Sequence, residues 1–348
     1  MNRLTGIKSC AVCLCADAHM LIPSLFVADS VRKQSRHRPI NIDVLIFAPP
    51  QDIAEEHRFW ASRRGISLRT DLPMEALSEI RILNGRLSSA TLMKLLMPAQ
   101  LAGCYEKVLY LDADTIIRAD VSAIFALEMG DSPIAAVPSG RLWLGVRKQE
   151  RDRWLTHFSA LGMSIPYRYF NSGVMLIHVD TWNKQQLGLQ ALDFIRRNPE
   201  LCFHPDEDAL NAILDGRFME LSPIWNMRPE ILSYMAFIGE PVILHYAGPV
   251  KPWRRFAKGK RLLEHRDAYR LYKSFVANTP WPRWLEGQWD TRDLVASIQQ
   301  ELRYLFTKVS RDAPAQNALE QWIADQKYAD VEQGITVRNR NALALADA

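Results

Sequence analysis

The sequence predicts an α/β protein built on a mostly parallel central sheet with flanking helices, followed by a helical C-terminal extension. Short apolar segments of strand length alternate with segments of helical periodicity over residues 1–255. Beyond residue 256 the strand-like segments stop and helical ones continue. A chain of 348 residues is long enough for both parts. We therefore expect one α/β domain over residues 1–255 and a helical extension over residues 256–348, whose end frays.

The expected strands are short apolar runs that end at turn-forming or acidic residues. Ser9–Ala16 stops at Asp17, and Ile42–Ala48 is closed by two prolines. A third run starts at Lys107 and meets two aspartates after Leu111. The remaining expected strands are Ile66–Leu72, Ile134–Val137, Phe170–Val179, Phe218–Leu221 and Val242–Tyr246. Their alternation with helices predicts that many of them pair in parallel.

The expected helices follow from apolar periodicity and from start and stop signals. Ser88–Ala102 begins at two serines, and Pro98 bends or shortens it. The other expected helices are Asp52–Arg64, Arg147–Leu161, Thr181–Arg197, Leu262–Val276, Arg292–Arg311 and a short one near Ala318–Lys327. The last three belong to the helical extension.

The composition indicates a soluble globular enzyme. The chain is 48% hydrophobic and 24% charged, with a net charge of +4 and a pI of about 8.8. This mild basicity suits anionic substrates or an anionic membrane surface, but it is too small to indicate a nucleic-acid partner. No Gly-x-Gly-x-x-Gly or Walker loop occurs, so glycine-rich phosphate cradles are not expected.

The cysteines and the apolar runs predict a cytoplasmic protein. Five cysteines form no disulfide-framework spacing, and Cys10, Cys13 and Cys15 lack a second cluster that would complete a zinc site. No apolar run approaches the length of a membrane span, and Asp17 and His19 interrupt the N-terminal apolar stretch too early for a secretion signal.

The most informative stretch is KVLYLDADTII, in which an apolar run ends in Asp112 and Asp114. Asp-x-Asp in an extended segment puts both carboxylates on one side, where they can hold a divalent cation that in turn holds a diphosphate. The alternative is two solvated aspartates that cap the following turn. Ligands of such sheets bind beyond the carboxyl ends of the strands, so Asp17, Asp112 and Asp114 are expected to share one crevice.

Four further segments accompany this aspartate pair. SSATLMKLLMP precedes it, and Phe170–Val174, Asp206–Asn211 and His245–Trp253 (HYAGPVKPW) follow it. In order and spacing these segments resemble glycosyltransferase family 8, from about Cys10 to Trp253, and most of all the bacterial lipopolysaccharide galactosyl- and glucosyltransferases. The resemblance implies a retaining enzyme with a single GT-A-type domain, which uses a UDP-sugar donor and manganese.

The resemblance also assigns roles to residues near the diphosphate. Asp112, Asp114 and His245 would ligate Mn²⁺, with Mg²⁺ as an alternative, and two carboxylates with one imidazole suit that ion. Lys251 would contact a phosphate as a point charge and stabilise the leaving diphosphate. Gly248 would allow close approach of the backbone to the diphosphate.

Further residues would hold the rest of the donor. Ala16 and Asp17 would bind the uridine, while Asn171 and Ser172 would contact the donor sugar. Asp206 would bind sugar hydroxyls, and its alternative role is a helix N-cap with a favourable dipole interaction, which is compatible with sugar binding.

Three positions depart from the family pattern. Lys94, a further donor-site residue, stands where many members have arginine. Lysine keeps the positive charge but cannot make the paired, bidentate hydrogen bonds of a guanidinium group. His19 replaces an asparagine of the uridine loop, and Ser139 replaces a sugar-contacting aspartate. The donor sugar therefore stays open between glucose, galactose and another hexose.

Glu207 is the fourth departure, because relatives commonly have glutamine between the two acidic residues. We take Glu207, Asp206 and Lys251 as candidate catalytic residues. Glu207 would stabilise an oxocarbenium-like transition state or form a glycosyl intermediate. Its alternative role is that of an ordinary acid in the first turn of a helix. The β-phosphate would take the acceptor proton, so no protein base is required.

The acceptor is predicted from a basic run and three tryptophans after the site. The expectation is a glycolipid or oligosaccharide, first a lipopolysaccharide core on the cytoplasmic leaflet, with peripheral contact to anionic membrane. A solvated basic face, tryptophans packed on the domain, and a soluble or protein acceptor, including self-glycosylation, are alternatives. A non-catalytic UDP-sugar-binding protein and a metal-dependent nucleotidyl- or phosphotransferase also stay open. The basic run consists of Lys251, Arg254, Arg255, Lys258, Lys260 and Arg261, and the tryptophans are Trp281, Trp284 and Trp289.

Overall fold

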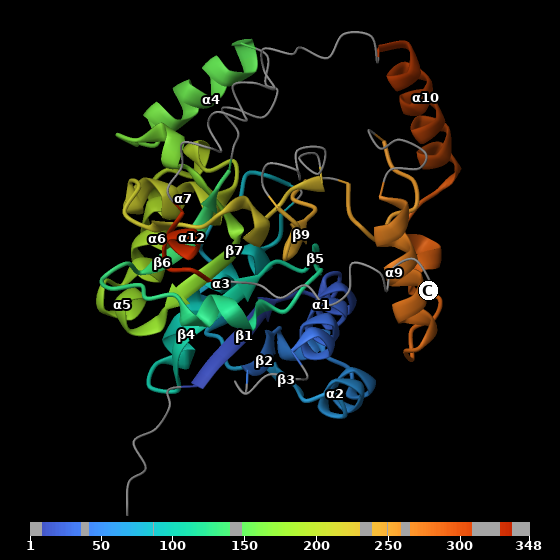
Figure 1. The fold of residues 1–348 in the computed structure, drawn as a ribbon, viewed down its shortest axis with the longest axis horizontal. Helices are drawn as coiled ribbons and strands as arrows, with labels where there is room; N and C mark the ends of the chain where they lie inside the picture. The colour runs from blue at the N-terminus through green and yellow to red at the C-terminus, as the bar shows by residue number, and fades with distance from the viewer. Residues whose placement is uncertain are drawn as a thin grey trace, which may run out of the picture.

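The centre of the protein is a seven-stranded sheet in the order β3-β2-β1-β4-β7-β6-β8 (Figure 1). The computed structural model describes residues 9–35, 42–85, 87–139, 148–229, 239–248, 250–258, 265–307 and 328–335. The strands are β1 (Ser9–Cys15), β2 (Ile42–Phe47), β3 (Ile66–Arg69), β4 (Tyr105–Leu111), β6 (Ile134–Pro138), β7 (Phe170–His178) and β8 (Met219–Glu220). β7 runs antiparallel to both of its neighbours, and the other pairs in this sheet are parallel. The predicted mostly parallel sheet is confirmed.

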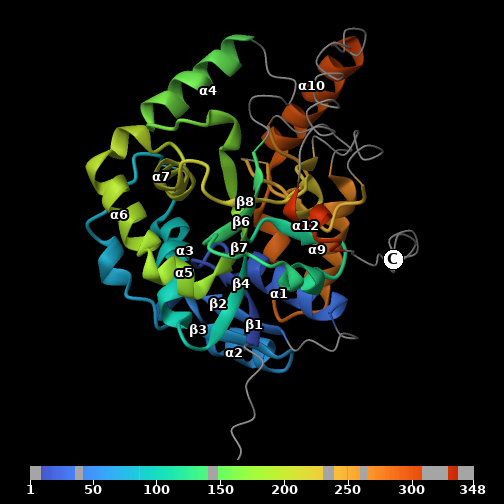
Figure 2. The ribbon, with the colours of Figure 1, turned by 60° about the vertical axis from the view of Figure 1, so that its left-hand side comes forward.

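The sheet is buried on both faces because its strands carry apolar side chains at successive positions. In β1, Val12 and Leu14 belong to one hydrophobic cluster, whereas Ala11 and Cys13 belong to another. The first cluster includes α1 (Leu21–Gln34) and the second includes α6 (Leu187–Arg197). Figure 2 shows these two helices on opposite sides of the strands.

The chain leaves the central sheet directly after β4. A turn over Asp112–Asp114 leads into β5 (Thr115–Ile117), which pairs antiparallel with β9 (Ile243–His245) in a separate two-stranded sheet. The turn is held by Thr115, whose hydroxyl donates to the Asp112 carbonyl at 2.9 Å. Because Thr115 is paired with His245, this small sheet brings the histidine beside the aspartate pair.

Most predicted helices form, with two corrections. The predicted helix Ser88–Ala102 consists of η3 (Ser89–Leu92), α3 (Met93–Leu96) and η4 (Met97–Leu101), since Pro98 cannot donate a helical hydrogen bond. Thr181–Arg197 is split into α5 (Val179–Lys184) and α6 at Gln186, which has a φ of 52°. The confirmed helices are α2 (Glu55–Ser62), α4 (Lys148–Ala160), α9 (Arg266–Ala277) and α10 (Thr291–Thr307).

Helix α1 is absent from the sequence prediction. Ten of its residues, including Ser24 and Asp29, are buried, so polar and apolar positions do not alternate with a helical period. The predicted strands near residues 66–72, 218–221 and 242–246 are shorter in the structure. The predicted helix Ala318–Lys327 lies outside the described residues, as do Lys260 and Arg261.

The C-terminal part packs against the α1 side of the domain. Tyr272 of α9 stacks on Phe26 of α1, with ring centroids 4.0 Å apart. Trp281 lies against Trp60, Trp284 against Trp253 and Trp289 against Phe256, so each of the three tryptophans has a partner within the protein. No helix among the described residues is long and apolar enough to span a membrane. The division at residue 255 stays a proposal from the sequence.

A short segment returns from the C-terminal part to the edge of the central sheet. It contains α12 (Ala329–Glu332) and the buried carboxylate of Asp330. Asp330 accepts hydrogen bonds from the Ser222 amide at 2.9 Å, the Ser222 hydroxyl at 2.6 Å and the Trp225 indole at 2.8 Å. These three bonds fasten η8 (Pro223–Trp225), the turn that precedes the residues beside β9.

Candidate active site

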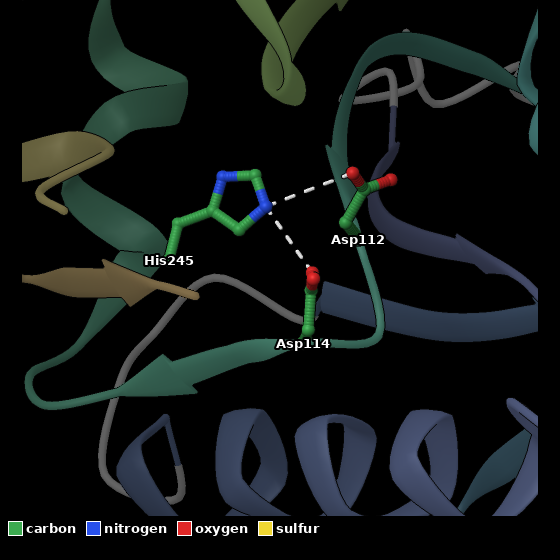
Figure 3. A group of neighbouring side chains, drawn as sticks. All are labelled: Asp112, Asp114 and His245. Carbon is green, nitrogen blue, oxygen red and sulfur yellow. Dashed lines mark ion pairs between the residues drawn. The ribbon is translucent and has the colours of Figure 1, made fainter. Parts of the chain in front are cut away.

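Asp112, Asp114 and His245 form a compact cluster at the end of β4, which we call the Asp–Asp–His cluster (Figure 3). The His245 Nε2 lies 3.1 Å from Asp114 Oδ1 and 3.7 Å from Asp112 Oδ2. One ligand atom from each residue lies within 4.8 Å of the other two. Two carboxylate oxygens and one imidazole nitrogen that converge in this way fit a divalent cation such as Mn²⁺.

Lys251 closes one side of the cluster. Its ammonium lies 2.5 Å from Asp114 Oδ2, and its side chain is 23% exposed, whereas the Asp114 side chain is 10% exposed. Burial alone would raise the pKa of Asp114, but the charges of Lys251 and His245 outweigh burial and hold this pKa well below its ordinary value. Asp114 is therefore ionised at neutral pH and ready to ligate a cation.

Lys94 is a buried cation at the base of the site. Its Nζ lies 3.0 Å from Asp112 Oδ1 and 2.7 Å from Asp206 Oδ2, and its side chain is only 2% exposed. Burial would lower the pKa of Lys94, but the charges of these two carboxylates overcome it and raise the pKa above its ordinary value. Tyr110 also donates to Asp112 Oδ1, at 2.7 Å. Lys94 thus links a predicted metal ligand to a predicted sugar-binding residue.

Asp206 and Glu207 lie in the first turn of α7 (Pro205–Leu214) and point toward β7. Asp206 accepts from the Ser172 hydroxyl at 2.7 Å. Glu207 Oε2 accepts from the Asn171 side-chain amide at 2.6 Å and from the Ser172 main-chain amide at 3.2 Å. The suggested N-cap role of Asp206 is wrong, because the N-cap is His204 and Asp206 is bonded to Ser172 and Lys94 instead.

Asn226 joins these residues to His245 and was missed in the sequence. Its Nδ2 donates to Asn171 Oδ1 at 2.9 Å, and its Oδ1 lies 2.9 Å from His245 Nδ1. A continuous chain of contacts therefore runs from Glu207 through Asn171 and Asn226 to His245. No local pattern marks Asn226, because its position depends on pairing with β9, almost twenty residues away in the sequence.

Gly173 is required by close packing at the centre of the site. A Cβ atom at this position would lie 2.1 Å from His245 Cε1 and 2.6 Å from Asp112 Oδ2, closer than atoms approach in proteins. The main chain of Gly173 also accepts from the Asp112 amide at 2.7 Å. Only glycine allows β7 to lie this close to two members of the Asp–Asp–His cluster.

Three predicted site residues lie outside this network of contacts. Asp17, at the end of β1, accepts from the amides of the turn into α1 and from the Ser88 hydroxyl at 2.7 Å. Ala16 is buried, and Gly248 is exposed, with no atom of the described residues, its chain neighbours aside, within 4 Å of an added Cβ. Their predicted contacts with uridine and diphosphate stay predictions.

Comparison with known proteins identifies the family. The profile described as glycosyl transferase family 8 matches residues 11–257, which is well over half of the chain and includes the whole Asp–Asp–His cluster. The chain belongs to glycosyl transferase family 8. It is a glycosyltransferase by family, and the resemblance found in the sequence is confirmed.

Individual relatives of this family 8 protein are similar over part of their length. General stress protein A of Bacillus subtilis is 29% identical over 49% of this chain and 59% of its own. Lipopolysaccharide glucosyltransferase WaaO of Escherichia coli is 32% identical over 43% of this chain and 45% of its own. The chain thus spans about half the length of the curated relatives it matches.

The fold is shared with a glycosyltransferase of known structure. The crystal structure of the galactosyltransferase LgtC, in complex with donor and acceptor sugar analogs, matches with a TM-score of 0.62 and 22% identity. The match covers 76% of this chain and 95% of LgtC. The predicted GT-A-type fold is confirmed by this likeness.

Proposed function

We propose that this family 8 protein is a retaining, Mn²⁺-dependent hexosyltransferase that transfers glucose or galactose from a UDP-sugar to a glycan or glycolipid. The observation that carries the proposal is the Asp–Asp–His cluster with Lys251 against it. Oxygen and imidazole donors suit Mn²⁺, and Mg²⁺ is the alternative ion. The names of WaaO and LgtC, a glucosyltransferase and a galactosyltransferase, support a hexose donor.

The leaving diphosphate would be stabilised on the Lys251 side of the cluster. When bound, the metal supplies a Lewis acid for the phosphate oxygens. Lys251, whose side chain is 23% exposed, adds a cation beside Asp114 that a phosphate can reach. An added Cβ at Gly248 would meet no atom of the described residues within 4 Å, its chain neighbours aside, which supports close approach of the backbone to the diphosphate.

The donor sugar would lie against β7 and the start of α7. Asn171 uses one amide hydrogen for Glu207, which leaves its second for a sugar hydroxyl, and Ser172 lies beside it. Asp206, held by Lys94, would accept from sugar hydroxyls. Ala16 and Asp17 would hold the uridine at the end of β1.

In the transfer step, the bond between the anomeric carbon and the β-phosphate oxygen breaks, and UDP leaves with the electron pair. The acceptor hydroxyl oxygen bonds to the same face of that carbon, and its proton passes to the β-phosphate. Glu207 is 4% exposed, and two donors hold one of its oxygens toward β7. A carboxylate in that position would stabilise the positive charge that develops on the sugar ring.

For the acceptor we propose a lipopolysaccharide core or a similar glycolipid at the cytoplasmic face of the membrane. The name of WaaO supports this class, and Arg255 and Lys258 lie exposed just after the site. Phosphorylated glycolipids and anionic membrane would both attract such cations. The three tryptophans lend no support to membrane contact, because each packs within the protein.

A donor screen tests the proposed function. UDP release would be measured with Mn²⁺ or with EDTA, over UDP-glucose, UDP-galactose, UDP-N-acetylglucosamine and UDP-glucuronate. We expect slow, Mn²⁺-dependent release from UDP-glucose or UDP-galactose, lost in Asp112→Asn and kept in Asp267→Asn, whose carboxylate is 81% exposed on α9. UDP binding without release from any donor, even when a lipopolysaccharide acceptor is added, would instead indicate a non-catalytic binding protein.

A further inference from the structure

We infer that Asn226 is a positioning residue for the metal site, because it is the last link of a polar relay that keeps a proton on His245 Nδ1 and reserves Nε2 for the metal. The relay consists of Glu207, Asn171, Asn226 and His245, joined by contacts of 2.6, 2.9 and 2.9 Å. The inference rests on the proposed function only in that it assigns the metal to the Asp–Asp–His cluster.

Main-chain groups near Glu207 fix which side chain donates and which accepts in each hydrogen bond of the relay, which we call its direction. The Ser172 amide donates to Glu207 Oε2, and the Gly173 amide donates to Asn171 Oδ1, each at 3.2 Å. A main-chain N–H can only donate, so the oxygen of Asn171 must face Gly173 and its nitrogen must face Glu207. A carboxylate at Glu207 agrees with this orientation because it only accepts.

The same direction passes on to His245. Since Asn171 presents an oxygen, Asn226 must present its nitrogen there, which turns the Asn226 oxygen toward His245 Nδ1. Nδ1 must then carry a proton, whatever occupies Nε2. Nε2 faces Asp112 and Asp114 and is the nitrogen left for the metal (Figure 3).

Asn226 is itself held in place by structure on both sides. The main chain of its neighbour Met227 donates to the Ile243 carbonyl at 2.9 Å and accepts from the His245 amide at 2.8 Å. These bonds hold the Asn226 side chain beside that of His245. Its other neighbour, Trp225, is fastened by Asp330. Asn226 is 6% exposed, and a buried amide in this position has no solvent to replace its partners.

Hydrogen bonds to the second nitrogen of a metal-bound histidine orient the ring, and their loss typically weakens metal binding about 10–100-fold. Asn226→Leu fills a similar volume without hydrogen bonds, and it should weaken Mn²⁺ binding by a factor in that range. Asn226→Asp keeps an acceptor for Nδ1–H but sets its second oxygen against Asn171 Oδ1, so we expect a Mn²⁺ affinity between those of the wild type and Asn226→Leu. Glu207→Gln can offer an oxygen to the Asn171 and Ser172 amides, so it should retain wild-type affinity.

The test measures Mn²⁺ affinity in the presence of saturating UDP by calorimetry, with Asn183→Leu as the control, because Asn183 donates a side-chain amide to Pro98, away from the site. A second readout, ¹⁵N–¹H NMR of histidine side chains in the metal-free protein, reports the proton on Nδ1, and His245→Gln identifies the signal. We expect an Nδ1–H in the wild type and in Asn226→Asp, and its loss or shift in Asn226→Leu.

Two results would overturn the inference: a wild-type His245 whose Nδ1 carries no proton, or Asn226→Leu binding Mn²⁺ as tightly as the wild type. Failure of the wild type to bind Mn²⁺ would count against the proposed function instead. In that case the NMR result alone decides whether the relay has the inferred direction. Circular dichroism of each variant shows whether it has folded.

Discussion

Gly173→Ala should disable the metal site while leaving most of the fold intact. The added Cβ would lie 2.1 Å from His245 Cε1, so the imidazole must move by more than about 1 Å to reach ordinary van der Waals contact. A shift of that size separates His245 from Asn226 Oδ1, now at 2.9 Å, and from Asp114. Misplacement by 1 Å costs about 100-fold in rate, and overpacking costs about 1–3 kcal/mol of stability.

The assay compares Gly173→Ala with Gly287→Ala for turnover, Mn²⁺ affinity with UDP bound, and the denaturant midpoint. An added Cβ at Gly287 meets no atom of the described residues within 4 Å, its chain neighbours aside, so this control should behave as the wild type. We expect at least about 100-fold lower turnover for Gly173→Ala, together with weaker Mn²⁺ binding. If Gly173→Ala binds Mn²⁺ and turns over normally, the described proximity of β7 to the cluster is not needed for function.

The remaining predictions concern buried charges. Lys94→Met leaves Asp206 without its cation, so unfolding free energy should fall by about 3–5 kcal/mol, and Lys94→Arg should retain more stability. Because the pKa of Lys94 is raised on folding, its stabilisation is complete below the ordinary value of 10.5 and is lost as pH rises through the folded pKa. In a melting series at increasing alkaline pH, the melting temperatures of the wild type and Lys94→Met should therefore converge. Asp330→Asn loses charge-assisted bonds to Trp225 and Ser222, so chemical denaturation should show a loss of about 1.5–3 kcal/mol, and an unchanged midpoint would contradict the described contacts.

The sequence was sufficient for the parts of the site that lie on local patterns. Asp112 and Asp114 follow an apolar strand, and His245 ends another, so their place at strand ends could be read from the run of residues alone. Their convergence was expected from the family resemblance. The structure supplies its cause, which is the departure of β5 from the central sheet to pair with β9.

The parts that escaped prediction depend on tertiary context. Helix α1 has no polar stripe because it is buried on most sides, so periodicity could not reveal it. Asn226 acquires its role only when Met227 pairs with β9. Asp206 looked like an N-cap because it stands near a helix start, but the helix begins at Pro205, and the Asp206 carboxylate is bonded to Lys94 and Ser172.

The bond between Asp330 and Ser222 joins residues 108 positions apart. Because the ribosome makes Ser222 long before Asp330, this bond forms only once Asp330 has been made. A nascent chain can build the central sheet and β9 before Asp330 has been translated. Until then the donors of Ser222 and Trp225 lack the acceptor that the finished fold gives them. The turn that carries Asn226 is therefore completed among the last steps of folding, and a chain whose translation stops early would hold an unfinished site.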